Sequence, residues 1–252
     1  MNTLYKPFHL TPFEKNINQK ANVNWDDIIA YVNDLAIGGV AIADASDGWV
    51  NFPIVPTYVS STSMRFSDVD YTGIIQKGDK LYIDQSGNKY FYITDVSFST
   101  HTTVTVTGGS DYTVANDTIV NPQFSKLATP QGFPLWHNWT PTYAGFSSDP
   151  TVSSCVFSVS GGFVNLFYKL NGAGTSNATT FQITNLPITA GLNDNGNGIR
   201  QFSGQDNGNA IDTICGYING TTLVLGKTVS VFNSWTASGG KCLFGFCLSY
   251  PM

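Results

Sequence analysis

The sequence predicts a mainly β protein with one short helix near its N-terminus. Charged residues make up only 12% of the 252 residues, and Glu14 is the only glutamate, so residues that favour helices are scarce. Apolar and polar residues alternate with a period of two in several short runs, as in strands that bury one face. We expect an N-terminal arm and short helix, then a small β-barrel or β-sandwich, and last a C-terminal β-sandwich that is jelly-roll-like.

Residues 1–45 are the only segment with helical periodicity. Asn24 can cap a helix, and Gly38 can end it. A helix of about thirteen residues is not stable alone in water, so its apolar stripe must pack on another surface. That surface is either another subunit or the open end of the following β-domain. The candidate residues for attachment or oligomer contacts are Trp25, Ile28, Ile29, Val32 and Leu35.

Residues 46–125 predict a small β-domain of about five to seven strands. Three of these strands each supply an inward row of two apolar residues. Ser86, Gly87 and Asn88 form a short turn between the first two strands. The inward rows are Leu81 and Ile83, Phe91 and Ile93, and Val104 and Val106. Prolines and a glycine disfavour regular structure in residues 126–134, so we expect the linker to the next domain there.

Residues 135–252 predict the C-terminal β-sandwich. Alternating runs at Cys155–Val159 and Val164–Leu170 flank a Ser-Gly-Gly turn, which indicates a β-hairpin. Residues 193–209 are rich in Gly and Asn and have few apolar side chains, so we expect a loop or two edge strands with long turns. The remaining strands are expected at residues 211–218, 221–231 and 242–250.

Two stretches of this third segment carry a family resemblance. The first is WTPTYAGFSSDP at Trp139–Pro150, and the second is GTSNATTFQITNLPITA at Gly174–Ala190. Together with the hairpin between them, they resemble a β-domain of the tail and head fibre proteins of tailed bacteriophages. The strand order of the second segment, followed by PQGFP at Pro130–Pro134, is similar to a module of phage tail and baseplate-attached proteins.

The resemblance implies a virion protein that is assembled in the host cytoplasm. It implies attachment of the N-terminal region to other virion proteins of the tail, baseplate or capsid. Because phage fibres are generally trimers, it also implies a homotrimer of sister subunits, which suits one short apolar helix. It carries no catalytic residues and leaves a head or a tail location open.

Charge and hydropathy disfavour two classes of partner. A net charge of -5 disfavours nucleic acid, because binding to phosphates needs clustered Lys and Arg. The first twenty residues mix charges and prolines with apolar residues, so we expect no export signal and no membrane insertion. We therefore expect the four cysteines to be thiols, with Cys155 and Cys247 as small buried apolar residues.

The sequence offers little catalytic or metal-binding chemistry. Asp68 and Asp70 form a close acidic pair, but such pairs in turn-rich proteins are far more often solvated turns than catalytic dyads. Asp194 and Asp206 offer oxygens to Ca²⁺ without the spacing of a calcium loop. His9, His101 and His137 are too far apart to indicate a metal site. We expect no enzyme, no cofactor and no metal.

Aromatic side chains near Asn, Asp and Gln indicate binding instead. Trp136, His137, Trp139 and Tyr143 form an aromatic cluster, and for Trp136 and Trp139 we favour a core or an interface, where such rings are enriched. For Trp235 and residues 193–209 we favour exposure and contact with a host receptor, either a surface glycan or a protein. The candidate receptor contacts are Trp235, Asn193, Asp194, Asn197, Gln205, Asp206 and Asn207.

Three hypotheses for function remain at this stage. The first is a fibre or spike subunit that is attached through its N-terminus and adsorbs to the host through its C-terminal domain. The second is a capsid decoration or baseplate subunit that binds no receptor. The third is a polysaccharide depolymerase, which needs a carboxylate pair that the sequence does not offer.

Overall fold

The structure is a computed structural model that describes residues 47–192, 199–228 and 232–252. Residues 1–50 and residues 51–252 form two compact units. The first unit is described only at its end, where the Asp47 carboxylate accepts a hydrogen bond from the backbone N–H of Trp49. The predicted helix lies outside the described residues, so attachment through its stripe stays a prediction. That stripe comprises Trp25, Ile28, Ile29, Val32 and Leu35.

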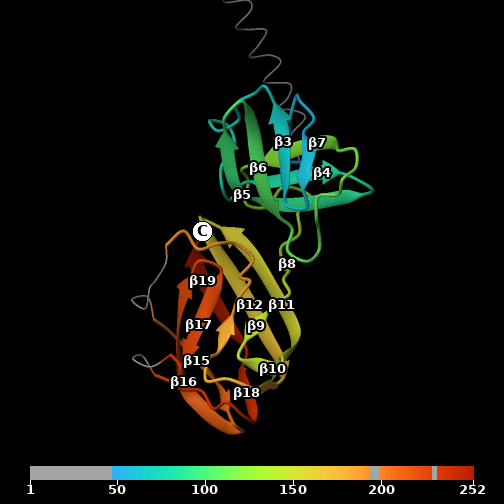
Figure 1. Cartoon of the computed structure of the whole chain (residues 1–252). Coiled ribbons are helices and arrows are strands. Elements are labelled where there is room, and N and C mark those ends of the chain that lie inside the picture. The colour runs from blue at the N-terminus through green and yellow to red at the C-terminus, as the bar shows by residue number, and fades with distance from the viewer. Residues whose placement is uncertain (1–46, 193–198, 229–231) are drawn as a thin grey trace, which may run out of the picture. The chain divides into compact units, whose positions relative to one another are not determined.

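The expected mainly β fold is confirmed. Across the described ranges the chain forms three antiparallel sheets and no helix. The first sheet has seven strands in the order β1-β7-β4-β5-β6-β3-β2 and curls into a nearly closed barrel (Figure 1). Its strands are β1 (Val50–Asn51), β2 (Thr57–Ser60), β3 (Ser63–Ser67), β4 (Lys80–Asp84), β5 (Asn88–Phe98), β6 (His101–Thr107) and β7 (Val120–Ser125).

The core of the barrel follows from the alternation in its strands. The three inward rows expected from the sequence are all buried, at 2% exposure or less. They meet across the sheet, because Leu81 pairs with Phe91 and Ile93 pairs with Val106. The predicted turn joins β4 to β5, where Asp84 pairs with Asn88. An aromatic cluster fills the rest of the core and comprises Phe52, Phe66, Tyr71 and Phe124.

The second and third sheets form the C-terminal sandwich. The four-stranded sheet has the order β19-β12-β11-β8, and the eight-stranded sheet has the order β10-β13-β18-β15-β16-β17-β14-β9. The smaller sheet comprises β8 (His137–Asn138), β11 (Thr151–Ser160), β12 (Phe163–Gly172) and β19 (Phe246–Pro251). The larger comprises β9 (Tyr143–Ala144), β10 (Phe146–Ser148), β13 (Gly174–Ser176), β14 (Gln182–Ile183), β15 (Arg200–Asp206), β16 (Asn209–Asn219), β17 (Thr222–Gly226) and β18 (Gly240–Leu243).

The predicted hairpin of the sandwich is confirmed as β11 and β12, which pair along their whole length. The inward side chains of β12 are buried against the larger sheet. Tyr168 of β12 contacts the larger sheet, because its hydroxyl lies 3.1 Å from the hydroxyl of Tyr143 in β9. Within its own sheet, its ring stacks on Phe246 at 4.8 Å. The last strand, β19, completes this sheet, and the Tyr250 hydroxyl donates a hydrogen bond to the Ile188 carbonyl oxygen.

The expectation of a loop or edge strands at residues 193–209 was wrong for its second half. Strand β15 lies inside the larger sheet, between β18 and β16. Gly204 permits the close approach of β18, since a Cβ there would lie 2.2 Å from the Cys242 carbonyl oxygen. Asn207 and Gly208, both with positive φ, make the two-residue turn to β16. An Asn-Gly pair between alternating runs is a strong hairpin signal, and it is the signal that the sequence analysis overlooked.

Candidate functional site

Trp235 belongs to the core of the sandwich, so its assignment as a receptor contact was wrong. The side chain is only 2% exposed. Its indole N–H donates a hydrogen bond of 2.9 Å to the Leu225 carbonyl oxygen, and its ring packs edge-on against Phe181 at 5.0 Å. The Ser- and Gly-rich surroundings suggested an exposed turn, but these two partners lie ten and fifty-four positions away and give no local signal.

Asp206 is also buried, at 5% exposure, and its assignment as a receptor contact was wrong for the same reason. Its carboxylate lies 2.6 Å from the ammonium group of Lys227 and accepts hydrogen bonds from the backbone N–H and the hydroxyl of Thr236. Burial alone would raise the pKa of Asp206, but the hydrogen bonds from Lys227 and Thr236 hold it below its usual value. This carboxylate ties the end of β15 to the segment that carries Trp235.

The other receptor candidates have separate outcomes. Gln205 is half-buried and Asn207 is exposed at the β15–β16 turn. Asn193, Asp194 and Asn197 lie outside the described residues, so contact of these three with a receptor stays a prediction.

A buried lysine that the sequence did not single out holds one end of the larger sheet together. Lys241 has no exposed surface. Its ammonium group donates to the carbonyl oxygens of Gly145, Ala178 and Thr180 at 3.0, 3.1 and 2.6 Å, and it lies 4.6 Å from the ring centre of Phe146. Burial lowers the pKa of Lys241 to about 8. With three acceptors and no access to solvent, this group is structural.

The aromatic residues at the start of the third segment differ in how deeply they are buried. His137 is fully buried, and its Nε2 lies 3.1 Å from the Tyr90 carbonyl oxygen. Burial lowers the pKa of His137, so the ring is neutral at pH 7. Trp139 is buried, as favoured from the sequence, whereas Trp136 is 46% exposed; Tyr143 is half-buried.

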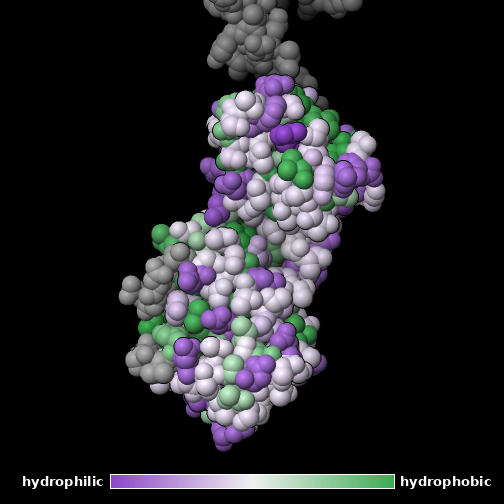
Figure 2. Space-filling model, viewed as in Figure 1, coloured by the Kyte–Doolittle hydropathy of each residue, from purple (hydrophilic) through white to green (hydrophobic). Residues whose placement is uncertain are grey.

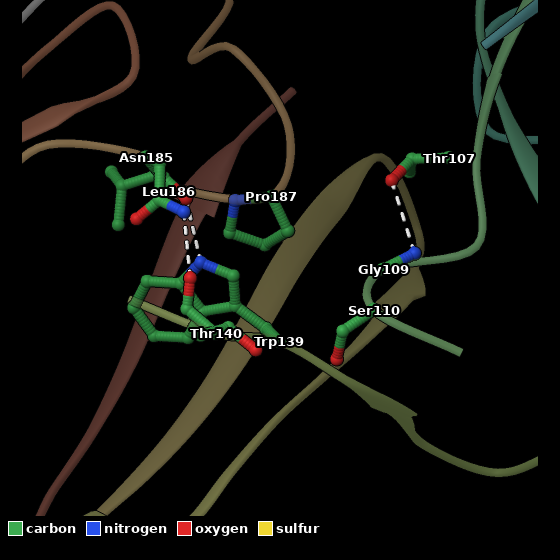
Figure 3. A pocket seen from close by; sticks show the side chains of 8 residues that line it. All are labelled: Thr107, Gly109, Ser110, Trp139, Thr140, Asn185, Leu186 and Pro187. Carbon is green, nitrogen blue, oxygen red and sulfur yellow. Dashed lines mark hydrogen bonds between the residues drawn. The ribbon is translucent and has the colours of Figure 1, made fainter. Parts of the chain in front are cut away.

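One cavity of about 310 Å³ lies beside Trp139 and is called the junction pocket. Figure 3 shows how its polar atoms are already used. The Trp139 indole N–H donates to the Asn185 carbonyl oxygen at 2.6 Å, and the Asn185 amide donates to the Thr140 carbonyl oxygen at 2.6 Å. The Thr107 hydroxyl accepts from the backbone N–H of Gly109. Because these hydrogen bonds already use the polar side chains of Trp139, Asn185 and Thr107, the junction pocket offers fewer free polar groups than the second cavity.

A second cavity, of about 370 Å³, has free polar groups and is called the corner pocket. It lies where the chain crosses from β18 in the larger sheet to β19 in the smaller one. Within the described part of the chain, the side chains of Gln201, Ser203 and Asp212 make no hydrogen bond. The lining residues are Gln201, Phe202, Ser203, Asp212, Gly245, Phe246 and Cys247.

The local sequence explains why these polar side chains face the corner pocket. In β15, the buried Phe202 alternates with the exposed Gln201 and Ser203, as a half-buried strand requires. In β16, the register shifts so that Asp212 and Thr213 together oppose Ser203. Such a β-bulge redirects a side chain, and bulges are enriched beside functional sites. The bulge therefore places a carboxylate next to a hydroxyl at the surface.

The outer face of the smaller sheet adjoins the corner pocket at Cys247. Phe163 and Phe167 on this face are 49% and 38% exposed, and Phe167 pairs with Cys247 across the sheet. Strands β11, β12 and β19 together carry one charged residue, Lys169. Figure 2 shows that residues of intermediate hydropathy predominate over the visible face of the molecule and that hydrophilic residues are scattered among them. A weakly charged surface with exposed rings is suited to binding.

The described residues contain few groups that are arranged for catalysis or metal binding. Asp68 and Asp70 are exposed, and Asp70 accepts hydrogen bonds from the backbone and hydroxyl of Thr72, as in a solvated turn. The described ranges contain no group of three or more His, Cys, Asp or Glu residues placed to hold a metal ion. They also contain no helix with the length and apolar character needed to span a bilayer.

The four cysteines are free thiols in the structure. Cys155, Cys215 and Cys242 are buried, so the expectation for Cys155 is confirmed. The expectation that Cys247 is buried was wrong, because its side chain faces outward from an edge strand that has no covering layer among the described residues.

No family model matches the sequence, and no curated protein or solved structure matches it significantly.

Proposed function

We propose that the chain is a fibre or spike subunit of a tailed-bacteriophage virion, and that it adsorbs the particle to the host cell through its C-terminal sandwich. In this proposal, residues 1–45 attach to another virion protein of the tail, baseplate or capsid, and three copies associate. The host partner is a surface glycan or a protein. The proposal includes no catalytic step.

The observation that carries this proposal is the fold of the two stretches that resemble phage fibres. Their ends meet, because Tyr143 of β9 pairs with Ile183 of β14 and the Trp139 indole binds the Asn185 carbonyl oxygen. Phe181 and Ile183 are buried. The resembling residues therefore build one structural unit of the sandwich rather than a string of separate turns, and the proposal takes this unit as the fibre-like domain.

The surface of the sandwich supports a binding role in that class. The outer face of its smaller sheet exposes Phe163 and Phe167, and Phe167 pairs with Cys247 of the corner pocket. Removing water from this face costs little, because Lys169 is the only charged residue on β11, β12 and β19. Rings of this kind provide contact area at low entropic cost, and they are enriched where binding energy is concentrated.

Adsorption of particles to host cells tests the proposal. Antibody fragments raised against residues 135–252 should block adsorption of assembled particles without affecting their assembly. Particles with Phe167→Ser should adsorb several-fold more slowly. Particles with Phe98→Ser, a ring on the barrel that is 44% exposed against 38% for Phe167, should adsorb normally. Normal adsorption in the presence of saturating antibody fragments would favour a decoration or baseplate subunit instead.

A further inference from the structure

We propose that the corner pocket binds one sugar unit of a host surface glycan, an inference that rests on the proposed adsorption function and names its ligand. The pocket combines three convergent polar side chains, Gln201, Ser203 and Asp212, with the ring of Phe246. Its volume of about 370 Å³ lies at the small end of the range for ligand sites, about 300–1,000 Å³.

The polar groups match the chemistry of sugar hydroxyls. A hydroxyl both donates and accepts hydrogen bonds, and so do the amide of Gln201 and the hydroxyl of Ser203. The Asp212 carboxylate only accepts, and charged acceptors form the stronger bonds. No partner among the described residues occupies these groups, so a ligand can take all three without breaking a bond inside the protein.

The aromatic wall matches the apolar face of a sugar ring. Phe246 is half-buried; Tyr168 stacks on it at 4.8 Å and Phe202 packs against it at 5.2 Å with an interplanar angle of 69°. These two contacts fix the orientation of the ring while part of it lines the pocket. A ring held in place loses little entropy when a ligand packs on it.

The same groups disfavour other ligands. A phosphate or another anion would meet the Asp212 carboxylate, and no Lys or Arg lines the pocket. A Ca²⁺ ion requires six to eight oxygen ligands, whereas Asp212 is the only carboxylate in the lining. A purely apolar ligand would leave three polar side chains desolvated without partners. A neutral polyhydroxylated ligand satisfies every lining group.

Cys247 at the rim of the pocket provides a built-in reporter of occupancy. It is exposed, whereas Cys155, Cys215 and Cys242 are buried, so a maleimide should modify Cys247 first in the native protein. A sugar in the pocket should slow this reaction. The test uses the full-length protein, the methyl glycosides of glucose, galactose and N-acetylglucosamine, and surface polysaccharide purified from cells that adsorb the particle.

We expect at least one of these probes to slow modification of Cys247 several-fold, and to receive saturation transfer from the protein in NMR spectra. Affinity for one sugar unit should be about millimolar, as is typical of a shallow site, and three copies in a trimer should raise it through avidity. Asp212→Ala should abolish both signals, and Gln201→Ala should weaken them. Asp95→Ala, an exposed carboxylate on β5 of the barrel, should leave both intact.

Protection by none of the probes, or equal protection in Asp212→Ala, would overturn the inference. An adsorption assay distinguishes failure of the pocket assignment from failure of the proposed function. If antibody fragments against residues 135–252 block adsorption while Asp212→Ala particles adsorb normally, the sandwich binds the host elsewhere and the pocket assignment is wrong. If the fragments do not block adsorption, the proposed function is wrong, and the maleimide assay decides on sugar binding by itself.

Discussion

The Lys227 ammonium group lies 2.6 Å from the Asp206 carboxylate, which is 5% exposed and also accepts two kinds of hydrogen bond from Thr236. A buried carboxylate is costly unless charged or polar partners surround it. Here Asp206 ends β15, and two other segments supply its partners: Lys227 directly follows β17, and Thr236 lies in the segment that leads to β18. The pair therefore joins segments of the larger sheet that are distant in sequence.

Replacing this carboxylate should make stability less dependent on acid pH. We expect Asp206→Asn to lower the free energy of unfolding at pH 7 by about 2–3 kcal/mol, because hydrogen bonds to a charged group are lost. The native pKa of Asp206 lies below its usual value, so the stabilisation is present above the unfolded pKa of about 4 and is lost as pH falls through the native pKa. Urea denaturation at pH 7 and at pH 2.5 measures both quantities.

In that experiment the difference in stability between the wild-type protein and Asp206→Asn should be smaller at the lower pH. Asp95→Asn, an exposed carboxylate with no described partner, serves as the control and should match the wild type at both values. A difference between wild type and Asp206→Asn that stays constant from pH 7 to pH 2.5 would contradict the role assigned to the ionised carboxylate.

Truncating Trp235 should destabilise the protein rather than weaken a surface contact. We expect Trp235→Ala to lower the free energy of unfolding by about 3–5 kcal/mol, since it removes a buried ring and leaves a cavity. Trp136→Ala removes a ring that is 46% exposed and should change stability by no more than about 0.5 kcal/mol. Chemical denaturation monitored by circular dichroism distinguishes them. Equal and small effects would place Trp235 at the surface after all.

The buried rows of the barrel and the burial of Trp235 show which features the sequence predicts and which it does not. Alternation of apolar and polar residues identified the buried rows of the barrel, such as Leu81 and Ile83. A strand with one buried face has this period of two in its own sequence, so neighbouring residues are enough to detect it. Burial of Trp235 depends on Phe181 and Leu225, which only the folded chain brings together. The central position of β15 in the sheet likewise depends on its pairing with β18, which is distant in sequence. The hairpin turn at Asn207-Gly208, in contrast, could have been predicted from the sequence. The corner pocket combines strands from two sheets and has no local motif.

The four cysteines should differ in reactivity. The thiolate is the reactive form, and burial raises the pKa of Cys155 to about 11 and also raises that of Cys242. Titration of the native protein with Ellman's reagent at pH 8 should therefore modify one thiol, at Cys247, within minutes. All four should react in denaturant. Cys247→Ser should abolish the native reaction, and rapid modification of a second thiol would show that the sandwich opens readily.

The junction between the barrel and the sandwich should depend on Gly109. Its φ of +62° lies in the left-handed region, and a Cβ on it would lie 2.0 Å from the Asn138 carbonyl oxygen. That oxygen accepts a hydrogen bond from the Ser110 backbone N–H, while Asn138 donates two hydrogen bonds to Asp111. A methyl group at residue 109 therefore has to push these hydrogen-bonded segments apart.

Gly161 provides a matched control for this prediction, because its φ is +57° and nothing lies within 4 Å of its Cβ position. Gly161→Ala should cost only the backbone strain, about 1–2 kcal/mol. Gly109→Ala should cost the same strain and a further ~1–3 kcal/mol from overpacking, measured by urea denaturation. It should also expose the linker at residues 126–134 to limited proteolysis, since the contacts that hold both of its ends together are weakened. Equal destabilisation by the two substitutions, with an unchanged proteolysis pattern, would mean that Asn138 yields without cost and that Gly109 is not needed for the junction.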